Sequence, residues 1–191
     1  PIREEVDGPP AGPRDRHLAV RAVAPPDRET TAPLIGVDLT PDEVRRATLL
    51  AARDTGTTAV SGTIHAVPSG SPAVFVAHPL YRSGRPPATT EERREEIVGY
   101  VTSGLLGTGL LEAVERNVGD PVGLRIEDPE SGRTLSESDP APGSGITVVR
   151  HVADRSWRIT VDDRQSVSLA GPAVTVAGAG ALAAALALLG R

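Results

Sequence analysis

The stretch "LIGVDLTPDEVRR" (residues 34–46) joins a short apolar run to the start of a helix. The apolar residues 34–37 predict a short buried strand, and Asp38 places a carboxylate at its end. Thr40 is expected to cap the helix, with a proline at the first helical position and Glu43 completing a capping box. Because Thr40 supplies this cap, Asp38 is left either as an exposed strand end or as the polar anchor of a pocket.

Strands and a helix are predicted on either side of this stretch. Residues 17–25 alternate as in a half-buried strand, and the helix that begins at residue 41 is expected to end at Gly56. Its predicted apolar face comprises Val44, Ala47, Leu50 and Ala51. Residues 58–67 and 72–81 are rich in β-branched residues and flank the turn "PSGS", which predicts a hairpin.

The second half of the chain repeats the mixture of strands and a helix. Residues 82–95 predict a linker or exposed loop, residues 97–106 a strand and residues 107–119 a short helix. Three further strands are expected at 122–128, 146–152 and 156–162. The sequence therefore predicts an α+β fold of two tandem PAS-like antiparallel-sheet subdomains, residues 17–88 and 89–164, with a boundary near residues 85–92.

The C-terminal segment differs in composition from the rest. No charged residue occurs between Arg164 and Arg191, and Ala, Gly, Leu and Val dominate after residue 172. A run of this length and apolarity predicts a transmembrane helix at residues 168–190; the alternative is a buried, Ala-rich helix of a soluble domain. With no initiator Met or signal peptide at the other end, the sequence is expected to be part of a longer chain, and residues 1–16 the end of a stalk or linker.

Composition excludes several classes of function. The net charge of -5 argues against a nucleic-acid partner, and the lack of cysteine removes thiolate chemistry and disulfides. The four histidines lack the spacing of a metal site. No nucleophile, base and oxyanion-binding group follow a recognisable pattern, so we expect no catalytic residues, no metal and no cofactor.

Four separated motifs resemble those of one known family, the CHASE domain, over roughly residues 16–130. The motifs are Gly-x-Asp at residues 36–38, Asp-Thr-Gly at 54–56, Pro-x-Tyr at 79–81, and Thr89 and Arg93 followed by Gly-Tyr-Val at 99–101. CHASE domains are extracytoplasmic sensory modules of histidine kinases, nucleotide cyclases and the plant cytokinin receptors. The resemblance implies two PAS-like subdomains, of which the membrane-distal one (residues 17–88 here) binds the ligand.

The resemblance also implies a set of ligand-binding residues. Asp38 matches the aspartate that binds the adenine ring in the cytokinin receptors, and Val60 and Ser61 match a strand that lines their pocket. At His78 the chain departs from the plant receptors, which carry an aromatic residue there, so a small polar or adenine-like ligand is expected rather than cytokinin itself. The full predicted set is Asp38, Val60, Ser61, His78, Leu80 and Tyr81.

Two functions are compatible with these observations. The leading hypothesis is the ligand-sensing domain of a homodimeric membrane receptor, lying outside the cytoplasm and relaying ligand binding to a histidine kinase or a diguanylate cyclase. The alternative is a membrane-anchored protein-interaction or structural domain without a small ligand. The two differ in whether the space behind Asp38 is open or is filled by side chains such as Leu80 and Tyr81.

Overall fold

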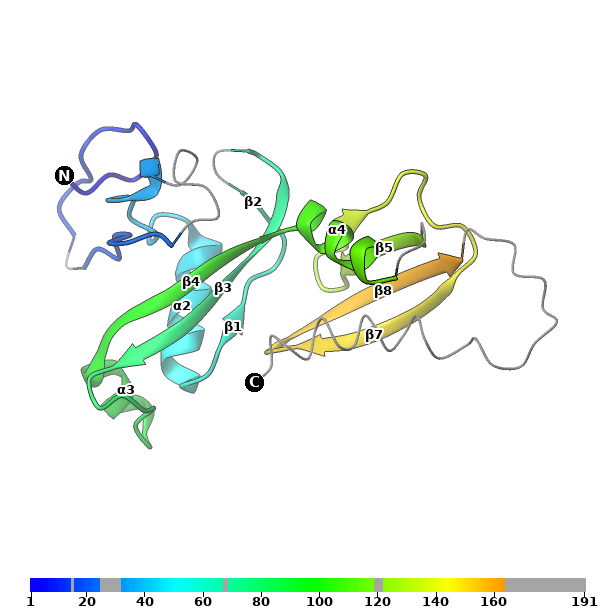
Figure 1. The fold of residues 1–191 in the computed structure, drawn as a ribbon. Coiled ribbons are helices and arrows are strands. Elements are labelled where there is room, and N and C mark those ends of the chain that lie inside the picture. Colours follow the sequence, from blue (N-terminus) through cyan, green and yellow to red (C-terminus); the bar gives the residue numbers. More distant parts are fainter. Residues whose placement is uncertain (15, 25–31, 67–68, 119–121, 164–191) are drawn as a thin grey trace. The chain divides into compact units, whose positions relative to one another are not determined.

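The computed structural model describes the chain except for residues 15, 25–31, 67–68, 119–121 and 164–191 (Figure 1). It has an α+β fold with antiparallel sheets. The helices are the 3-10 turn η1 (Ala32–Leu34), α2 (Glu43–Thr55), α3 (Thr90–Glu96) and α4 (Gly107–Val118). The strands are β1 (Ala59–Val60), β2 (Ile64–His65), β3 (Pro72–Tyr81), β4 (Ile97–Leu106), β5 (Val122–Asp128), β6 (Arg133–Glu137), β7 (Ile146–Val152) and β8 (Arg155–Asp163).

The strands form two four-stranded sheets. In the first, the long strand β3 pairs with the short strands β1 and β2 and with β4, which runs in the opposite direction (Figure 1). The second has the order β6-β5-β8-β7, with every neighbouring pair antiparallel. The strands predicted around residues 72–81, 97–106, 122–128, 146–152 and 156–162 are thus confirmed.

The chain divides into two compact units. It passes from one to the other just before β1, within β3 and within β4. Unit 1 comprises Pro1–Thr57 and His78–Val101, and unit 2 comprises Thr58–Ala77 and Thr102–Arg191. The boundary expected near residues 85–92 falls inside unit 1. Sequence patterning did not anticipate this division, because a single long strand can serve two compact units without any turn or linker to mark the change.

The start of α2 differs from the expectation. Asp42, not Thr40, is the N-cap: its side chain accepts a hydrogen bond of 2.8 Å from the backbone N–H of Arg45. The capping box predicted for Thr40 and Glu43 is therefore wrong, since the helix begins two residues later than expected. The helix end was predicted correctly, with Gly56 as a left-handed C-cap at φ 76°.

The buried face of α2 also differs from the predicted one. Thr48, Leu49 and Ala52 are buried, whereas Val44 and Leu50 are 42% and 37% exposed. The face predicted from the apolar side chains at 44, 47, 50 and 51 is therefore not the face of α2 that packs against the rest of the protein. Ala52 is small enough to pack closely against the core. Thr48 is buried with its hydroxyl group satisfied, because it donates a hydrogen bond to the carbonyl of Val44.

The N-terminal segment packs without regular strands. Neither the strand expected at 17–25 nor that at 34–37 forms in the described residues; η1 and a turn take the place of the second. Isolated bridges join Ala19 to Asp38 and Arg3 to Val37. Gly36 turns the chain at φ 88°, a conformation that glycine adopts without strain and that leads directly into Asp38.

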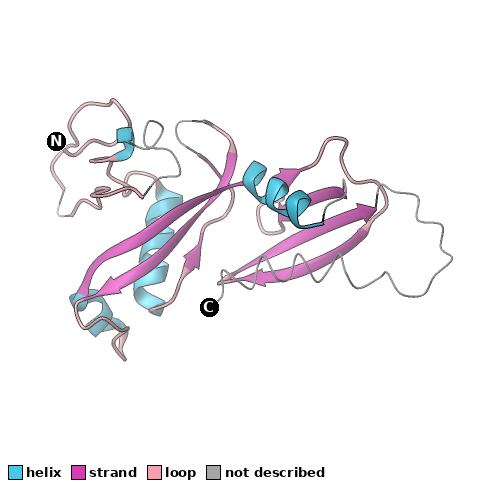
Figure 2. Ribbon diagram, in the orientation of Figure 1, coloured by secondary structure: helices cyan, strands magenta, loops and turns pink. Residues whose placement is uncertain are grey.

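Unit 2 contains the main hydrophobic core. Its fully buried members include Leu124 and Ile159, which face Trp157 and Val74 in the same cluster. Helix α4 covers this core with its partly buried apolar side chains (Figure 2). Strand β6 was not expected from sequence, since "RTLSE" has no hydrophobic run; burial of Leu135 and Ser136 inserts it into the sheet. Likewise α3, within the expected linker, is a short helix with a capping box at Thr89 and Glu92.

The transmembrane helix predicted at residues 168–190 lies outside the described residues. Among the helices that are described, none combines the length and apolarity needed to cross a bilayer.

The N-cap of α2 can be tested with two neighbouring carboxylates. We expect Asp42→Ala to lower the free energy of unfolding by about 1 kcal/mol, because it removes the acceptor for a backbone N–H of the first turn. Glu43→Ala is the matched control: it removes the same charge from the same helix end but no cap, so it should change stability by less than about 0.5 kcal/mol. Urea unfolding at pH 7 measures both. Equal losses would mean that helix-dipole charge, rather than the cap, stabilises this end.

Candidate functional site

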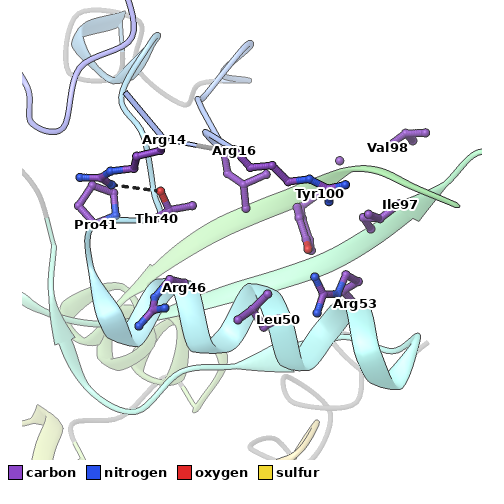
Figure 3. Close-up of a pocket in the computed structure, with 12 residues that line it drawn as sticks. Arg14, Arg16, Thr40, Pro41, Arg46, Leu50, Arg53, Ile97, Val98 and Tyr100 are labelled. Atoms are coloured by element: carbon purple, nitrogen blue, oxygen red, sulfur yellow. Dashed lines mark hydrogen bonds between the residues drawn. The ribbon is translucent and has the colours of Figure 1, made fainter. Parts of the chain in front are cut away.

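Unit 1 contains a cavity of about 710 Å³ between the N-terminal segment, one face of α2 and the first part of β4 (Figure 3). Arg46, Leu50 and Arg53 recur at helical spacing, so they lie on one face of α2. Four consecutive residues of β4, Ile97–Tyr100, form the opposite wall. The remaining lining residues are Arg14, Arg16, Leu18, Thr40 and Pro41.

The charged lining is entirely cationic. Arg14, Arg16, Arg46 and Arg53 line the cavity, and no carboxylate is among the described residues that do so. Arg16 has no hydrogen-bond or ion-pair partner within the described part of the chain. Arg53 uses its Nε atom to bind Asp54 at 2.7 Å. The other two arginines have carboxylate neighbours outside the lining.

Tyr100 places a phenol among these guanidinium groups. Figure 3 shows it between Arg16 on the N-terminal segment and Arg53 on α2. Burial raises the pKa of Tyr100, although the charges of Arg53 and Arg16 act in the opposite direction. The phenol is therefore protonated at neutral pH and carries an O–H that can donate a hydrogen bond.

Asp38 does not line this cavity but contacts three residues that do, Arg14, Leu18 and Thr40, and is a structural centre of unit 1. Its side chain is completely buried. Oδ1 accepts hydrogen bonds from the backbone N–H groups of Leu18 and Thr40, both at 3.0 Å, and from the Thr40 hydroxyl at 2.8 Å. Oδ2 lies 2.7 Å from Nδ1 of His17 and 3.9 Å from a guanidinium nitrogen of Arg14. The carboxylate therefore fixes His17 and Leu18 of the N-terminal segment and Thr40 just before α2.

Hydrogen bonding keeps the Asp38 carboxyl ionised. Burial by itself would raise the pKa of Asp38, but the hydrogen bonds from Thr40, His17 and Leu18 outweigh it and hold the pKa below its ordinary value of 3.8. A lowered carboxyl pKa in the folded state means that ionisation favours folding. That contribution is complete above pH 4 and is lost as the pH falls through the folded-state pKa.

The other residues predicted from sequence do not line the cavity. Val60 belongs to the core of unit 2. Ser61 is buried beside it: its Oγ accepts from the backbone N–H of Phe75 at 2.8 Å and donates to the carbonyl of Gly62 at 2.7 Å. Together with the backbone hydrogen bond from Ser61 N–H to the carbonyl of Phe75 at 2.8 Å, this hydrogen bonding ties the segment between β1 and β2 to β3.

The three predicted residues on β3 lie on opposite faces of the strand. His78 and Leu80 are exposed, and Tyr81 is buried, with its hydroxyl donating to the carbonyl of Arg53 at 2.6 Å. Tyr81 thus fastens the last turn of α2 rather than lining the cavity. Ligand contact by Asp38, Val60, Ser61, His78, Leu80 and Tyr81 stays a prediction.

Two of the sequence motifs contact each other at the end of α2. Arg94 binds both carboxylate oxygens of Asp54, at 3.1 and 2.6 Å, and Arg93 donates to the carbonyl of Asp54 at 2.5 Å. Side-chain hydrogen bonds from Arg94 and then Arg53 hold the pKa of Asp54 far below its ordinary value. A Cβ at Gly56 would come within 3.0 Å of Pro86 and 3.1 Å of Arg93, so glycine permits this close approach.

Sequence reasoning missed the arginines that line the cavity. A signal existed: Arg46 and Arg53 are seven residues apart on a predicted helix, with Leu50 between them on the same face. It was overlooked because the apolar face of that helix was assigned to the core. Arg14 and Arg16 lie in a segment with no regular structure, for which the pattern of residues gives no direction.

The Asp38 network makes a prediction about acid stability. At pH 7, Asp38→Asn should lower the free energy of unfolding by about 1–3 kcal/mol, because an NH₂ group replaces one acceptor oxygen among several donors. The gap between the variant and the original protein should narrow as the pH falls from about 4 through the lowered folded-state pKa of Asp38, because the original carboxyl loses its charge over that range. Chemical unfolding from pH 7 to pH 2 measures this.

The matched control is Asp7→Asn, since Asp7 is exposed. It should leave stability within about 0.5 kcal/mol of the original at every pH. A gap for Asp38→Asn that stays constant from pH 7 to pH 2 would contradict the role of the ionised carboxyl.

Comparison with known proteins identifies the family. The sequence model of the CHASE domain family matches residues 2–141. No curated protein matches the chain. Nine chains of solved structures match, among them the ligand-binding domain of the amino acid chemoreceptor PctC of Pseudomonas aeruginosa PAO1 in complex with GABA. That structure is 13% identical, with a TM-score of 0.38, over 63% of this chain and 61% of its own.

The chain thus spans about three fifths of the length of that chemoreceptor domain. The family match covers well over half of the present chain. It includes all four sequence motifs, and all four lie in unit 1. The protein belongs to the CHASE domain family, whose members are extracytoplasmic sensory domains rather than catalytic ones.

Proposed function

We propose that this chain is the ligand-sensing domain of a transmembrane receptor and that a small molecule binds in the cavity of unit 1. The observation that carries the proposal is the cavity itself, about 710 Å³ in a sensory-domain family, with polar groups converging on it from three segments. Ligand sites are commonly concave, partly apolar and equipped with a few such groups.

The signal has a proposed route out of the domain. The predicted transmembrane helix at residues 168–190 would carry it to a cytoplasmic histidine kinase or diguanylate cyclase in a homodimeric receptor. A ligand changes the signalling state only by the difference in its affinity for the two states of the domain. The uncharged C-terminal sequence and the family membership support this part of the proposal.

In this proposal Asp38 acts by positioning rather than by direct contact. Its oxygens are occupied by Leu18, Thr40 and His17, so a ligand would have to displace an existing donor to reach it. The sequence-based hypothesis placed the ligand at this carboxylate. The cavity preserves the importance of Asp38 but gives the ligand contacts to its neighbours Arg14 and Thr40.

A second candidate function is a protein-interaction domain. Strand β7 is an edge of the second sheet, and its side chains Ile146 and Val149 are 67% and 52% exposed. Exposed apolar groups on an unpaired strand edge suit the addition of a strand from a partner. This observation favours the alternative hypothesis of a membrane-anchored domain without a small ligand.

A thermal-shift screen distinguishes the two candidates. The 191-residue chain, in a nonionic detergent, is screened against purines, amino acids and small organic acids. A ligand present at 100 times its dissociation constant should add about 2.7 kcal/mol of stability. The sensor proposal predicts such a shift for at least one compound.

Two glycines of β4 provide a matched pair of blocking variants. Gly99 lines the cavity and Gly104 does not, and in both cases no atom lies within 4 Å of an added Cβ. We expect Gly99→Trp to abolish the ligand-induced shift and Gly104→Trp to preserve it. If both variants respond like the original chain, the ligand binds elsewhere; if no compound stabilises the original chain, the small-ligand function is wrong.

A further inference from the structure

We propose that the cavity of unit 1 is a site for a small organic acid with two or three carboxylate groups. This inference rests on the proposed ligand-sensing function and specifies the class of ligand. It follows from the charge of the lining, from the distance between its arginines and from the apolar surface between them.

The side chains that line the cavity carry a net positive charge. Arg14, Arg16, Arg46 and Arg53 contribute four guanidinium groups, and none of the twelve lining residues is acidic. Arginine stays protonated at any physiological pH and offers a planar pair of donors that matches a carboxylate. A cationic ligand would be repelled, and a neutral ring would add no negative charge to the lining.

Carboxylates outside the lining compensate these arginines only in part. Asp54 is shared between Arg53 and Arg94, and Arg94 takes the bidentate contact. Arg46 reaches Glu43 at 3.8 Å through exposed side chains, an interaction worth less than about 1 kcal/mol.

The two arginines of the N-terminal segment differ in this respect. Arg14 is paired with Glu4 and lies 3.9 Å from Asp38, whose oxygens already accept from other donors. Arg16 has no carboxylate partner among the residues that the structure describes. Arg16 and the terminal nitrogens of Arg53 are therefore the donors most available to a ligand.

The spacing of the arginines favours a ligand with charges at more than one place. Arg46 and Arg53 are seven residues apart, which corresponds to about 10 Å along a helix. Arg14 and Arg16 come from a different segment, across the cavity from α2 (Figure 3). One compact anion could contact one side of this arrangement, whereas two separated carboxylates can engage both.

The surface between the arginines suits a carbon chain. Leu18, Leu50 and Ile97 line the cavity together with the phenol of Tyr100, whose hydroxyl can donate to a carboxylate oxygen. Inorganic phosphate would leave this apolar surface unused. An α-amino acid would bring an ammonium group into a lining that holds no acidic partner for it.

The test is calorimetric titration of the 191-residue chain, in a nonionic detergent at pH 7, with glutarate, adipate and citrate. The comparators are butyrate with one carboxylate, inorganic phosphate, glycine as a zwitterion and adenine as a neutral ring. We expect at least one polycarboxylate to bind at least 10-fold more tightly than every comparator. Binding should weaken as NaCl is raised from 50 to 300 mM, because salt screens the guanidinium charges.

The variants separate the cavity from general positive charge. Arg16→Gln/Arg46→Gln should weaken polycarboxylate binding at least 10-fold; both side chains are exposed and neither makes a strong ion pair, so the fold should survive. Arg85→Gln is the control, since Arg85 is an exposed arginine of unit 1 outside the lining. Circular dichroism verifies that each variant is folded.

Each result decides between the two proposals. If adenine, glycine or another library compound binds and no polycarboxylate does, the sensor function stands and the inference about ligand class is wrong. Equal affinity for phosphate, or equal weakening by Arg85→Gln, likewise overturns it. If neither this panel nor the wider screen yields a ligand, the sensor function fails together with the inference.

Discussion

The buried carboxylate of Asp38 is the interaction on which unit 1 depends. It accepts hydrogen bonds from the backbone of Leu18 and from both the backbone and the hydroxyl of Thr40, and it faces His17 at 2.7 Å. No regular strand connects these segments. Isolated backbone hydrogen bonds, such as that from the N–H of Val20 to the carbonyl of Val37, join them, and the Asp38 cluster adds side-chain hydrogen bonds to the same contact. An unpaired buried charge costs several kcal/mol, which makes the complete set of donors necessary.

A second cluster fixes the opposite end of α2. Asp54 is bound by Arg53 and Arg94, Arg93 donates to its carbonyl, and Tyr81 donates to the carbonyl of Arg53. The helix is thereby held at its C-terminus by β3 and α3, whereas Asp42 caps its N-terminus through a contact within the helix. The face that carries Arg46 and Arg53 is left to line the cavity. The geometry of the cavity thus depends in part on residues that do not line it, such as Asp54 and Tyr81.

Much of the fold was predictable because most elements carry a strong local signal. The strands at 97–106 and 122–128 follow from β-branched runs, and Gly56 marks the end of α2 as a left-handed cap. The N-cap was misplaced by two residues, since Thr40 and Asp42 are both good caps and only the path of the chain after Asp38 decides between them. The strand β6 carries no hydrophobic pattern and forms because its neighbours pair with it.

The site was harder to predict than the fold. The resemblance to the CHASE family drew attention to Asp38 and to β3. In the structure Asp38 and Tyr81 are buried and hydrogen-bonded within the protein, and His78 and Leu80 are exposed outside the cavity lining. The charged lining depends on which face of α2 is buried, and small residues such as Ala52 decide that face by close packing. Hydrophobicity alone favoured the wrong face. A residue's role at a cavity is thus set by tertiary contacts that its own sequence neighbourhood does not contain.

The most direct test of this account is nuclear magnetic resonance of the arginine Nε–Hε groups during titration with citrate and adipate. The account predicts shifts for Arg16, Arg46 and Arg53, which line the cavity, and unchanged resonances for Arg133 and Arg158 of unit 2. Shifts of similar size for all arginines, or shifts confined to unit 2, would contradict the claim that the arginines around α2 form an anion site.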